Sequence, residues 1–228
     1  CNVKNKDNEA SRLISPSNKY PNRTLFALAS KALTHLLKHL PSEYKQFTLH
    51  SMIDLKQEVM QVEKLLTNSY GLQTGILVTQ TDVEKMFTNL DHNEIIRAVA
   101  WLLNIYTGME KRKHYTTRSD YKDTIYVNKR FPYECTWQTH NNSKLWQKSE
   151  LIDLLRIVKY DLQNIFTTTG TLFFQQKRGA PIGGFLSCNC TNIKCAYDEK
   201  DFPKKFYLSV KEFEMTKLFA KLMTLLLG

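Results

Sequence analysis

The sequence predicts an α+β fold in which a small antiparallel sheet packs on helices. Apolar residues recur at helical spacing within residues 25–40, 55–66, 95–103, 151–165 and 208–227. Short segments rich in β-forming residues lie between these stretches, at 75–81, 124–127 and 166–176. Because most of the strands fall in one insert and one hairpin and do not alternate regularly with helices, the order is typical of the α+β class.

The first three helices have recognisable ends. Pro41 ends the first helical pattern, and Gly71 lies just beyond the second, which leads into the apolar strand 75–81. The third begins at a capping box, since Asp91 can accept hydrogen bonds from first-turn amides and Glu94 can reach back. The apolar stripe predicted for the first helix is Leu25, Leu28, Ala32, Leu33, Leu36, Leu37 and Leu40. The stripe predicted for the third is Ile95, Ile96, Val99, Leu102 and Leu103.

Residues 111–148 form a predicted β-rich insert that is both basic and aromatic. Residues 124–127 have strand propensity. Such a mixture can follow a phosphate backbone and stack on bases, and a solvated β-excursion explains the composition equally well. The basic residues predicted to contact nucleic acid here are Lys111, Arg112, Lys113, Lys129 and Arg130.

The elements after the insert follow in a clear order. A helical stripe from Leu151 to Ile165 precedes a hairpin centred on Gly170. A glycine-containing turn at residues 178–184 then leads into a helix over 186–197. A last helical pattern covers 208–227.

The composition favours an intracellular protein with a polyanionic partner. Lys and Arg number 32 against 22 Asp and Glu, giving a net charge of +10, and such an excess suggests nucleic acid. No segment resembles a signal peptide, and no apolar run approaches the roughly 18 residues that span a bilayer. We therefore expect a nuclear or cytoplasmic protein that is neither secreted nor bound to a membrane. The odd number of cysteines predicts reduced thiols, with Cys188, Cys190 and Cys195 as small packing residues.

Asp82 is the best candidate for a catalytic metal ligand. It stands where the apolar strand 75–81 ends, and Phe87 follows at the fifth position after it. A carboxylate at a strand end can hold a divalent cation, because the strand fixes the backbone and the ion needs hard oxygen ligands. Aspartate also ends strands simply because it favours turns.

Two further segments carry candidate binding residues. Arg12, with Lys19 nearby, can place positive groups on a phosphate. Residues 176–187 contain glycines that allow the backbone to approach a ligand closely before a helix starts.

In this order and spacing, the three segments resemble the fingers and palm of reverse transcriptases, over residues 12–198. Arg12-Leu13-Ile14 is similar to the second fingers motif, Arg-x-Ile, and residues 82–87 are similar to the first palm motif. Residues 176–187 match the next palm motif, Gln-x-x-Gly-x-Pro-x-Gly-x-x-x-Ser. Two short sequences, Phe87-Thr88-Asn89 and the pattern Gln-x-x-Gly-x-x-x-Gly at residues 176–183, are most similar to those of Penelope-like retroelements.

The resemblance implies an RNA-directed DNA polymerase that uses two Mg²⁺ or Mn²⁺ ions. Its partners would be an RNA template, a DNA primer and deoxynucleoside triphosphates. Asp82 and the Val83 carbonyl would hold the ions, and Phe87 would exclude a ribose 2′-hydroxyl. The other residues implied to bind nucleotide are Arg12, Lys19, Gln176, Gly179, Pro181 and Gly183. Lys177 and Arg178 would contact nucleic acid.

One departure from the family pattern matters. The third palm motif, an aromatic-x-Asp-Asp hairpin, is not present before Gly228, and we interpret Asp198 and Glu199 as charges at a helix end. We therefore expect residues 1–228 to be a single fingers-and-palm fragment of a longer retroelement protein, inactive alone. The alternative is a noncatalytic nucleic-acid-binding module from a decayed or domesticated reverse transcriptase.

Overall fold

The computed structural model describes residues 21–41, 86–108, 122–131, 134–140, 142–169 and 171–200, together with single positions between 44 and 64. By its contacts the chain divides into two compact units. The first comprises Cys1–His39 and Lys85–Lys194, and the second comprises Leu40–Glu84 and Cys195–Gly228. The elements below lie in the first unit, except for the last residues of its final helix.

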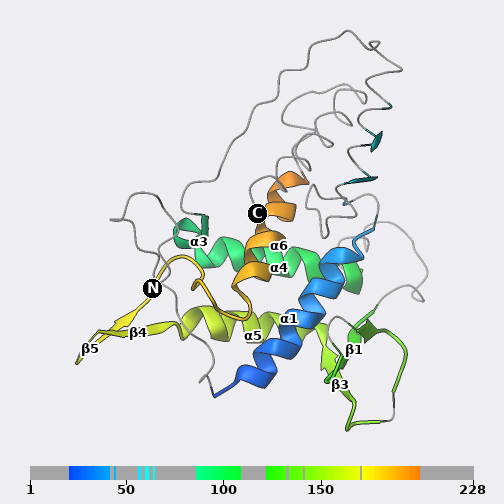
Figure 1. Ribbon diagram of the computed structural model, residues 1–228, viewed down its shortest axis with the longest axis horizontal. Coiled ribbons are helices and arrows are strands. Elements are labelled where there is room, and N and C mark those ends of the chain that lie inside the picture. The colour runs from blue at the N-terminus through cyan, green and yellow to red at the C-terminus, as the bar shows by residue number, and fades with distance from the viewer. Residues whose placement is uncertain are drawn as a thin grey trace. The chain divides into compact units, whose positions relative to one another are not determined.

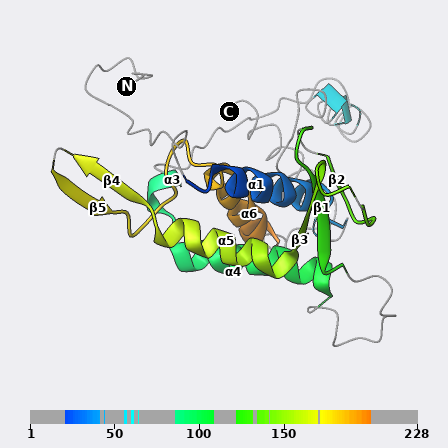
Figure 2. The same ribbon diagram turned by 90° about the horizontal axis from the view of Figure 1, so that it is seen from below.

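Three long helices form the core of the first unit (Figures 1 and 2). They are α1 (Arg23–Lys38), α4 (His92–Thr107) and α5 (Leu151–Gln163). Helix α5 packs on both α4 and α1. The apolar side chains buried between them are Phe26, Ala29, Leu33, Leu36, Ile95, Val99, Leu102, Leu151, Leu154, Val158 and Leu162. The three helices are those that the apolar spacing predicts, because one buried stripe per helix is what such packing needs.

The stripe of α1 is shifted from the predicted one at its start. Leu25 is exposed, and Phe26 and Ala29 are buried in its place. The assignment of Leu25 to the core was wrong because helical spacing from Leu33 back to the N-terminus fits either Leu25 or Phe26. Packing favours the larger ring, which stacks near Tyr160 of α5 with 6.4 Å between centroids.

A three-stranded antiparallel sheet with the order β2-β1-β3 follows α4. Its strands are β1 (Thr124–Asn128), β2 (Cys135–Thr136) and β3 (Trp146–Glu150). Ile125 and Val127 of β1 are buried, and α1 contacts β1 and β2. The predicted strand and the α+β class are therefore confirmed.

The chain then forms a hairpin and a final helix. Strands β4 (Phe166–Thr169) and β5 (Leu172–Gln175) pair antiparallel, with Thr169 opposite Leu172. Helix α6 runs over Ser187–Glu199. Both elements match their predicted positions, and Asp198 is exposed near the end of α6.

Three predicted elements lie outside the described residues. They are the strand 75–81, the helix 208–227 and all but single positions of the helix 55–66. Within the described part of the chain, no helix has the length and apolar character that crossing a membrane requires.

Candidate functional site

The short helix α3 (Met86–Asn89) and the glycine turn, residues 178–184, lie against each other. The Ala180 amide donates to the Phe87 carbonyl at 2.6 Å, and the Gly179 amide donates to the Leu90 carbonyl at 2.7 Å. Two of the segments singled out in the sequence, some ninety positions apart, are therefore joined directly through their backbones.

Gly179 is required at this contact for two reasons. Its φ is +77°, in the left-handed region that side chains disfavour. A Cβ there would lie 2.5 Å from the Phe87 carbonyl oxygen and 2.7 Å from the Thr88 Cα. Both neighbours are backbone atoms, so neither can move without displacing α3. The glycine thus allows the turn to meet α3 without a gap.

His92 adds a third bond to the same contact. Its Nε2 lies 2.8 Å from the Gly179 carbonyl. Since a carbonyl accepts, the tautomer that fits carries the proton on Nε2. The amide and the carbonyl of Gly179 are both bonded, one to Leu90 and one to the first residue of α4. The sequence gives no signal for His92 beyond its place after the first palm motif.

The far end of the glycine turn is fixed to α6. The Ser187 hydroxyl donates to the Pro181 carbonyl at 2.6 Å, and the Gly184 amide donates to the same carbonyl at 3.0 Å. Ser187 is buried. This arrangement accounts for a serine at the last position of the motif. Gly183, with a φ of +94°, lies in the turn between Pro181 and Ser187.

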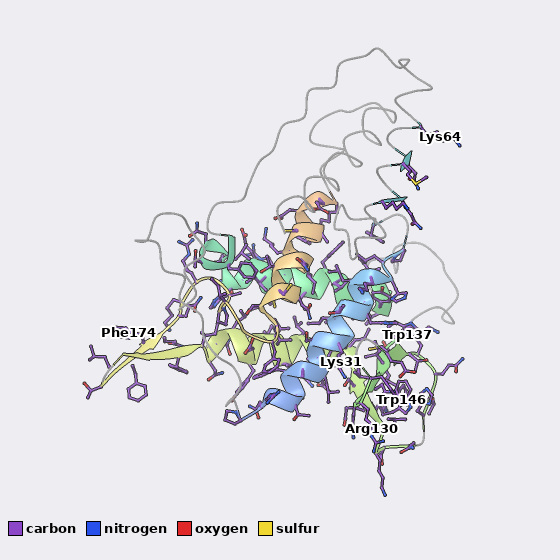
Figure 3. All side chains as sticks on the ribbon, viewed as in Figure 1. Lys31, Lys64, Arg130, Trp137, Trp146 and Phe174 are labelled. Carbon is purple, nitrogen blue, oxygen red and sulfur yellow. The ribbon has the colours of Figure 1, made fainter. Side chains whose placement is uncertain are left out.

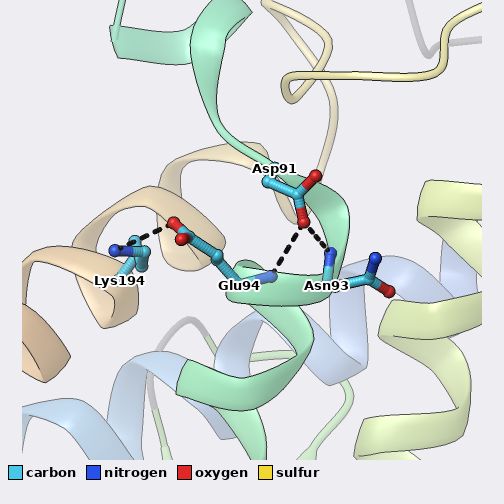
Figure 4. Close-up of polar contacts among 4 residues, drawn as sticks. All are labelled: Asp91, Asn93, Glu94 and Lys194. Atoms are coloured by element: carbon cyan, nitrogen blue, oxygen red, sulfur yellow. Dashed lines mark hydrogen bonds and ion pairs between the residues drawn. The ribbon is translucent and has the colours of Figure 1, made fainter.

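One half of the predicted capping box, the half supplied by Asp91, forms at the start of α4 (Figure 4). Asp91 Oδ1 accepts from the Asn93 and Glu94 amides at 2.8 and 3.3 Å. Glu94 does not complete the box. Its carboxylate lies 3.4 Å from Lys194 Nζ, which joins α4 to α6. Helix α6 is also tied to α1, because the buried Asn189 donates to the Ser30 carbonyl at 2.8 Å.

The described basic residues of the site fall into two separate groups. Lys177 and Arg178 are exposed at the entrance of the glycine turn. Lys129 and Arg130 are exposed beyond β1, and Lys129 Nζ donates to the Ser143 carbonyl at 2.6 Å. Figure 3 places Arg130 and Phe174, in the strand before Lys177, at opposite ends of the unit. The structure therefore does not bring the insert's Lys129 and Arg130 to the glycine turn.

Both tryptophans of the insert contact other rings of their own unit. His140 stacks on Trp146 with 4.1 Å between centroids and an 8° angle. Trp137 lies 5.5 Å from the ring of Tyr106 and 6.1 Å from that of His35. Tyr106 in turn donates to the Leu36 carbonyl at 2.6 Å, and burial raises its pKa. These rings join the sheet to α1 and α4.

Asp161 of α5 is half-buried and Cys190 of α6 is buried, and the charge of Asp161 acts on the Cys190 thiol. Burial raises the pKa of Asp161 to about 6. Burial, with the Asp161 charge as a smaller cause, raises the pKa of the Cys190 thiol to about 12. A buried thiol with so high a pKa is an inert packing residue, as the sequence predicts for Cys190.

Several predicted site residues lie outside the described residues. They are Arg12, Lys19, Asp82, Val83, Lys111, Arg112 and Lys113. In the part of the chain that is described, no three or more His, Cys, Asp or Glu side chains gather as a metal site would require. Phe87, Gln176, Gly179, Pro181 and Gly183 are the predicted nucleotide-binding residues that the structure places.

Comparison with known proteins bears on the fold. No protein-family model matches the chain, and no curated protein matches it. Among solved structures, it is similar to telomerase from Candida albicans, determined in complex with the TWJ fragment of telomeric RNA. The TM-score is 0.50 at 12% sequence identity. The fold is polymerase-like. The match covers 82% of this chain and 28% of the telomerase chain.

Proposed function

We propose that this chain is the fingers-and-palm part of a reverse transcriptase that copies RNA into DNA. The observation that carries the proposal is the direct contact between α3 and the glycine turn. In the resemblance stated above, these two segments are palm motifs that meet at the incoming nucleotide. The polymerase-like fold supports the same assignment, since telomerase is a reverse-transcriptase-related enzyme.

The described residues have separate tasks in this proposal. Phe87 is half-buried and absent from the fully buried core, so its ring can bound a pocket for the sugar of the nucleotide. Gln176 Nε2 donates to the Arg178 carbonyl at 2.8 Å, which fixes the entrance of the turn. The turn itself, held at Gly179 and Pro181, supplies a rigid surface beside the base pair. Rigid placement of this kind is how polymerases gain rate, because nucleotidyl transfer depends on positioning and electrostatics.

Asp82 and the Val83 carbonyl are proposed to hold the Mg²⁺ ions, together with carboxylates from the third palm motif. When bound, such ions lower the pKa of the primer 3′-hydroxyl and stabilise charge on the transferring phosphate. Val83 lies three positions before Met86, where α3 begins.

The proposal is tested by primer extension with the full-length protein. We expect Asp82→Asn to abolish extension on an RNA template while leaving affinity for an RNA–DNA hybrid nearly intact, because it removes a metal ligand and no phosphate contact. Asp91→Asn is the matched control, because Asp91 caps α4 and is not one of the proposed metal ligands. Extension by Asp82→Asn at the wild-type rate would overturn the metal assignment. Hybrid binding without extension by the wild-type protein would favour the noncatalytic binding module.

A further inference from the structure

The hairpin β4–β5 exposes apolar side chains on both faces. It extends away from the helices of its unit (Figures 1 and 2). The exposed fractions are 56% for Phe166, 60% for Leu172, 79% for Phe173 and 52% for Phe174. Successive strand residues point to opposite faces, so Phe173 and Phe174 present one ring to each side. Four large apolar side chains exposed on one short hairpin mark an interaction site.

The charges around the hairpin favour a polyanion as its partner. No Asp or Glu occurs between Asp161 and Asp198, a stretch that contains Lys177, Arg178 and Lys194. Lys177 and Arg178 directly follow the hairpin and are exposed. Exposed aromatic rings beside basic residues are typical of surfaces that bind single-stranded nucleic acid. In a duplex the base faces are already stacked, so the rings would have no partner there.

The hairpin is bonded to the end of α5 and leads directly into the glycine turn. The Gln176 amide donates to the Ile165 carbonyl at 2.9 Å, and Gln175 Nε2 donates to the Gln163 carbonyl at 2.7 Å. These bonds fix the base of the hairpin to the end of α5. From Phe174 to Gly179 the chain advances five residues, at most about 17 Å. A strand held on the hairpin would therefore be held within a few nucleotides of the turn.

We propose that the hairpin binds an unpaired nucleic-acid strand by stacking bases on Phe173 and Phe174, while Lys177 and Arg178 contact its phosphates. The inference rests on the proposed function only in assigning this strand as the template that enters the glycine turn. Stacking on aromatic rings is tolerant of sequence, since every base has a flat face. The surface would thus hold any single strand and would not select one by sequence.

The test measures binding of a fluorescent twelve-nucleotide single-stranded RNA to the 228-residue chain. We expect the double variant Phe173→Ser/Phe174→Ser to lose at least about tenfold in affinity, with an unchanged salt dependence. Lys177→Gln/Arg178→Gln should instead flatten the salt dependence by about 1.4 units of log–log slope, since each phosphate contact on a single strand contributes about 0.7. Leu25→Ser is the control, because Leu25 is 47% exposed on α1, outside both the hairpin and the basic insert, and should leave affinity unchanged.

Crosslinking keeps the test decisive if the double variant does not fold. Wild-type chain irradiated with RNA that carries 4-thiouridine should crosslink at residues 172–174. Unchanged affinity in the folded variant, or crosslinks only elsewhere, would overturn the inference. The inference would also be overturned if the Phe173→Ser/Phe174→Ser variant bound RNA normally but no longer self-associated in sedimentation experiments. The hairpin would then be a contact between protein chains. Primer extension by the full-length protein is a separate readout, so binding through the hairpin without any primer extension by that protein would refute the proposed function alone.

Discussion

Gly179 is the residue whose replacement most directly tests the contact between α3 and the glycine turn. Gly179→Ala would strain a φ of +77° and push a methyl group onto backbone atoms of α3. We expect a loss of at least about 2 kcal/mol in the free energy of unfolding, measured by urea titration.

Gly184→Ala is the matched control for that variant. A Cβ at Gly184 would also meet an atom at 2.5 Å, but this atom is the Ser187 hydroxyl, which can rotate. We expect a smaller loss, of about 1 kcal/mol. Equal losses at both glycines would contradict the account, because they would show that the close approach to α3 carries no special cost.

Asp161 predicts a pH dependence of stability with a definite sign. Burial raises its pKa to about 6 in the folded chain, whereas the unfolded value is about 3.9. Folding therefore favours the protonated form of Asp161. The stability that this protonated side chain contributes is fully present below about pH 4 and is lost as the pH rises through about 6. Asp161→Asn lacks this loss. We expect the free energy of unfolding of Asp161→Asn, relative to that of the wild type, to be about 1–3 kcal/mol higher at pH 7.5 than at pH 4.

The measurement is urea unfolding of both proteins at the two pH values. Asp153→Asn, an exposed position on the same helix, serves as the matched control for removing one carboxylate. A difference between Asp161→Asn and wild type that is the same at both pH values would show that Asp161 is not held in a desolvating environment.

At the scale of elements, Lys31 joins α1 to the loop that follows β1 (Figure 3). Its Nζ lies 3.0 Å from the Asn128 carbonyl, 3.1 Å from that of Phe131 and 3.5 Å from that of Lys129. The loop is also bridged by Asn128 Oδ1, which accepts from the Arg130 amide at 2.9 Å. A single ammonium group thus contacts three backbone carbonyls at the end of β1 and in the loop after it.

We expect Lys31→Met to lower the free energy of unfolding by about 1–2 kcal/mol, because charge-assisted bonds to carbonyls are lost. Hydrogen exchange at residues 128–131 should accelerate in the same variant. Lys148→Met, an exposed position on β3, should change neither quantity. Unchanged exchange at 128–131 in Lys31→Met would contradict the role given to Lys31.

The helices could be predicted from the sequence because each carries its own periodic and terminal signals. The Asp91 cap, the stripe from Leu151 to Leu162 and the hairpin around residue 170 depend only on nearby residues. Lys31 could not be predicted, since its partners lie about a hundred positions away and a lysine on a helix gives no signal of them. The same holds for Glu94, which bonds Lys194 of α6 where the local pattern suggests a bond to its own helix end.

At the scale of the whole molecule, the sequence could name Phe87 and the glycines of residues 179–184 but not show that they meet. Their contact depends on how α4, α5 and α6 pack, which no local pattern contains. The role of His92 could not be predicted for the same reason, because it depends on a hydrogen bond to Gly179, which is distant in the sequence. The insert shows the opposite case. Its aromatic composition suggested base stacking, whereas Trp137 and Trp146 contact rings within their own unit.

The central claim is that Phe87, held beside the glycine turn, bounds the sugar pocket of a DNA-synthesising enzyme. It is tested most directly by sugar choice in primer extension by the full-length protein, with Phe87→Val compared with wild type. A shorter side chain would remove the clash with a ribose 2′-hydroxyl, so we expect the variant to accept ribonucleotides and to keep its use of deoxynucleotides. Phe131→Val controls for loss of an exposed ring elsewhere. A folded, active Phe87→Val enzyme that still rejects ribonucleotides would contradict the claim.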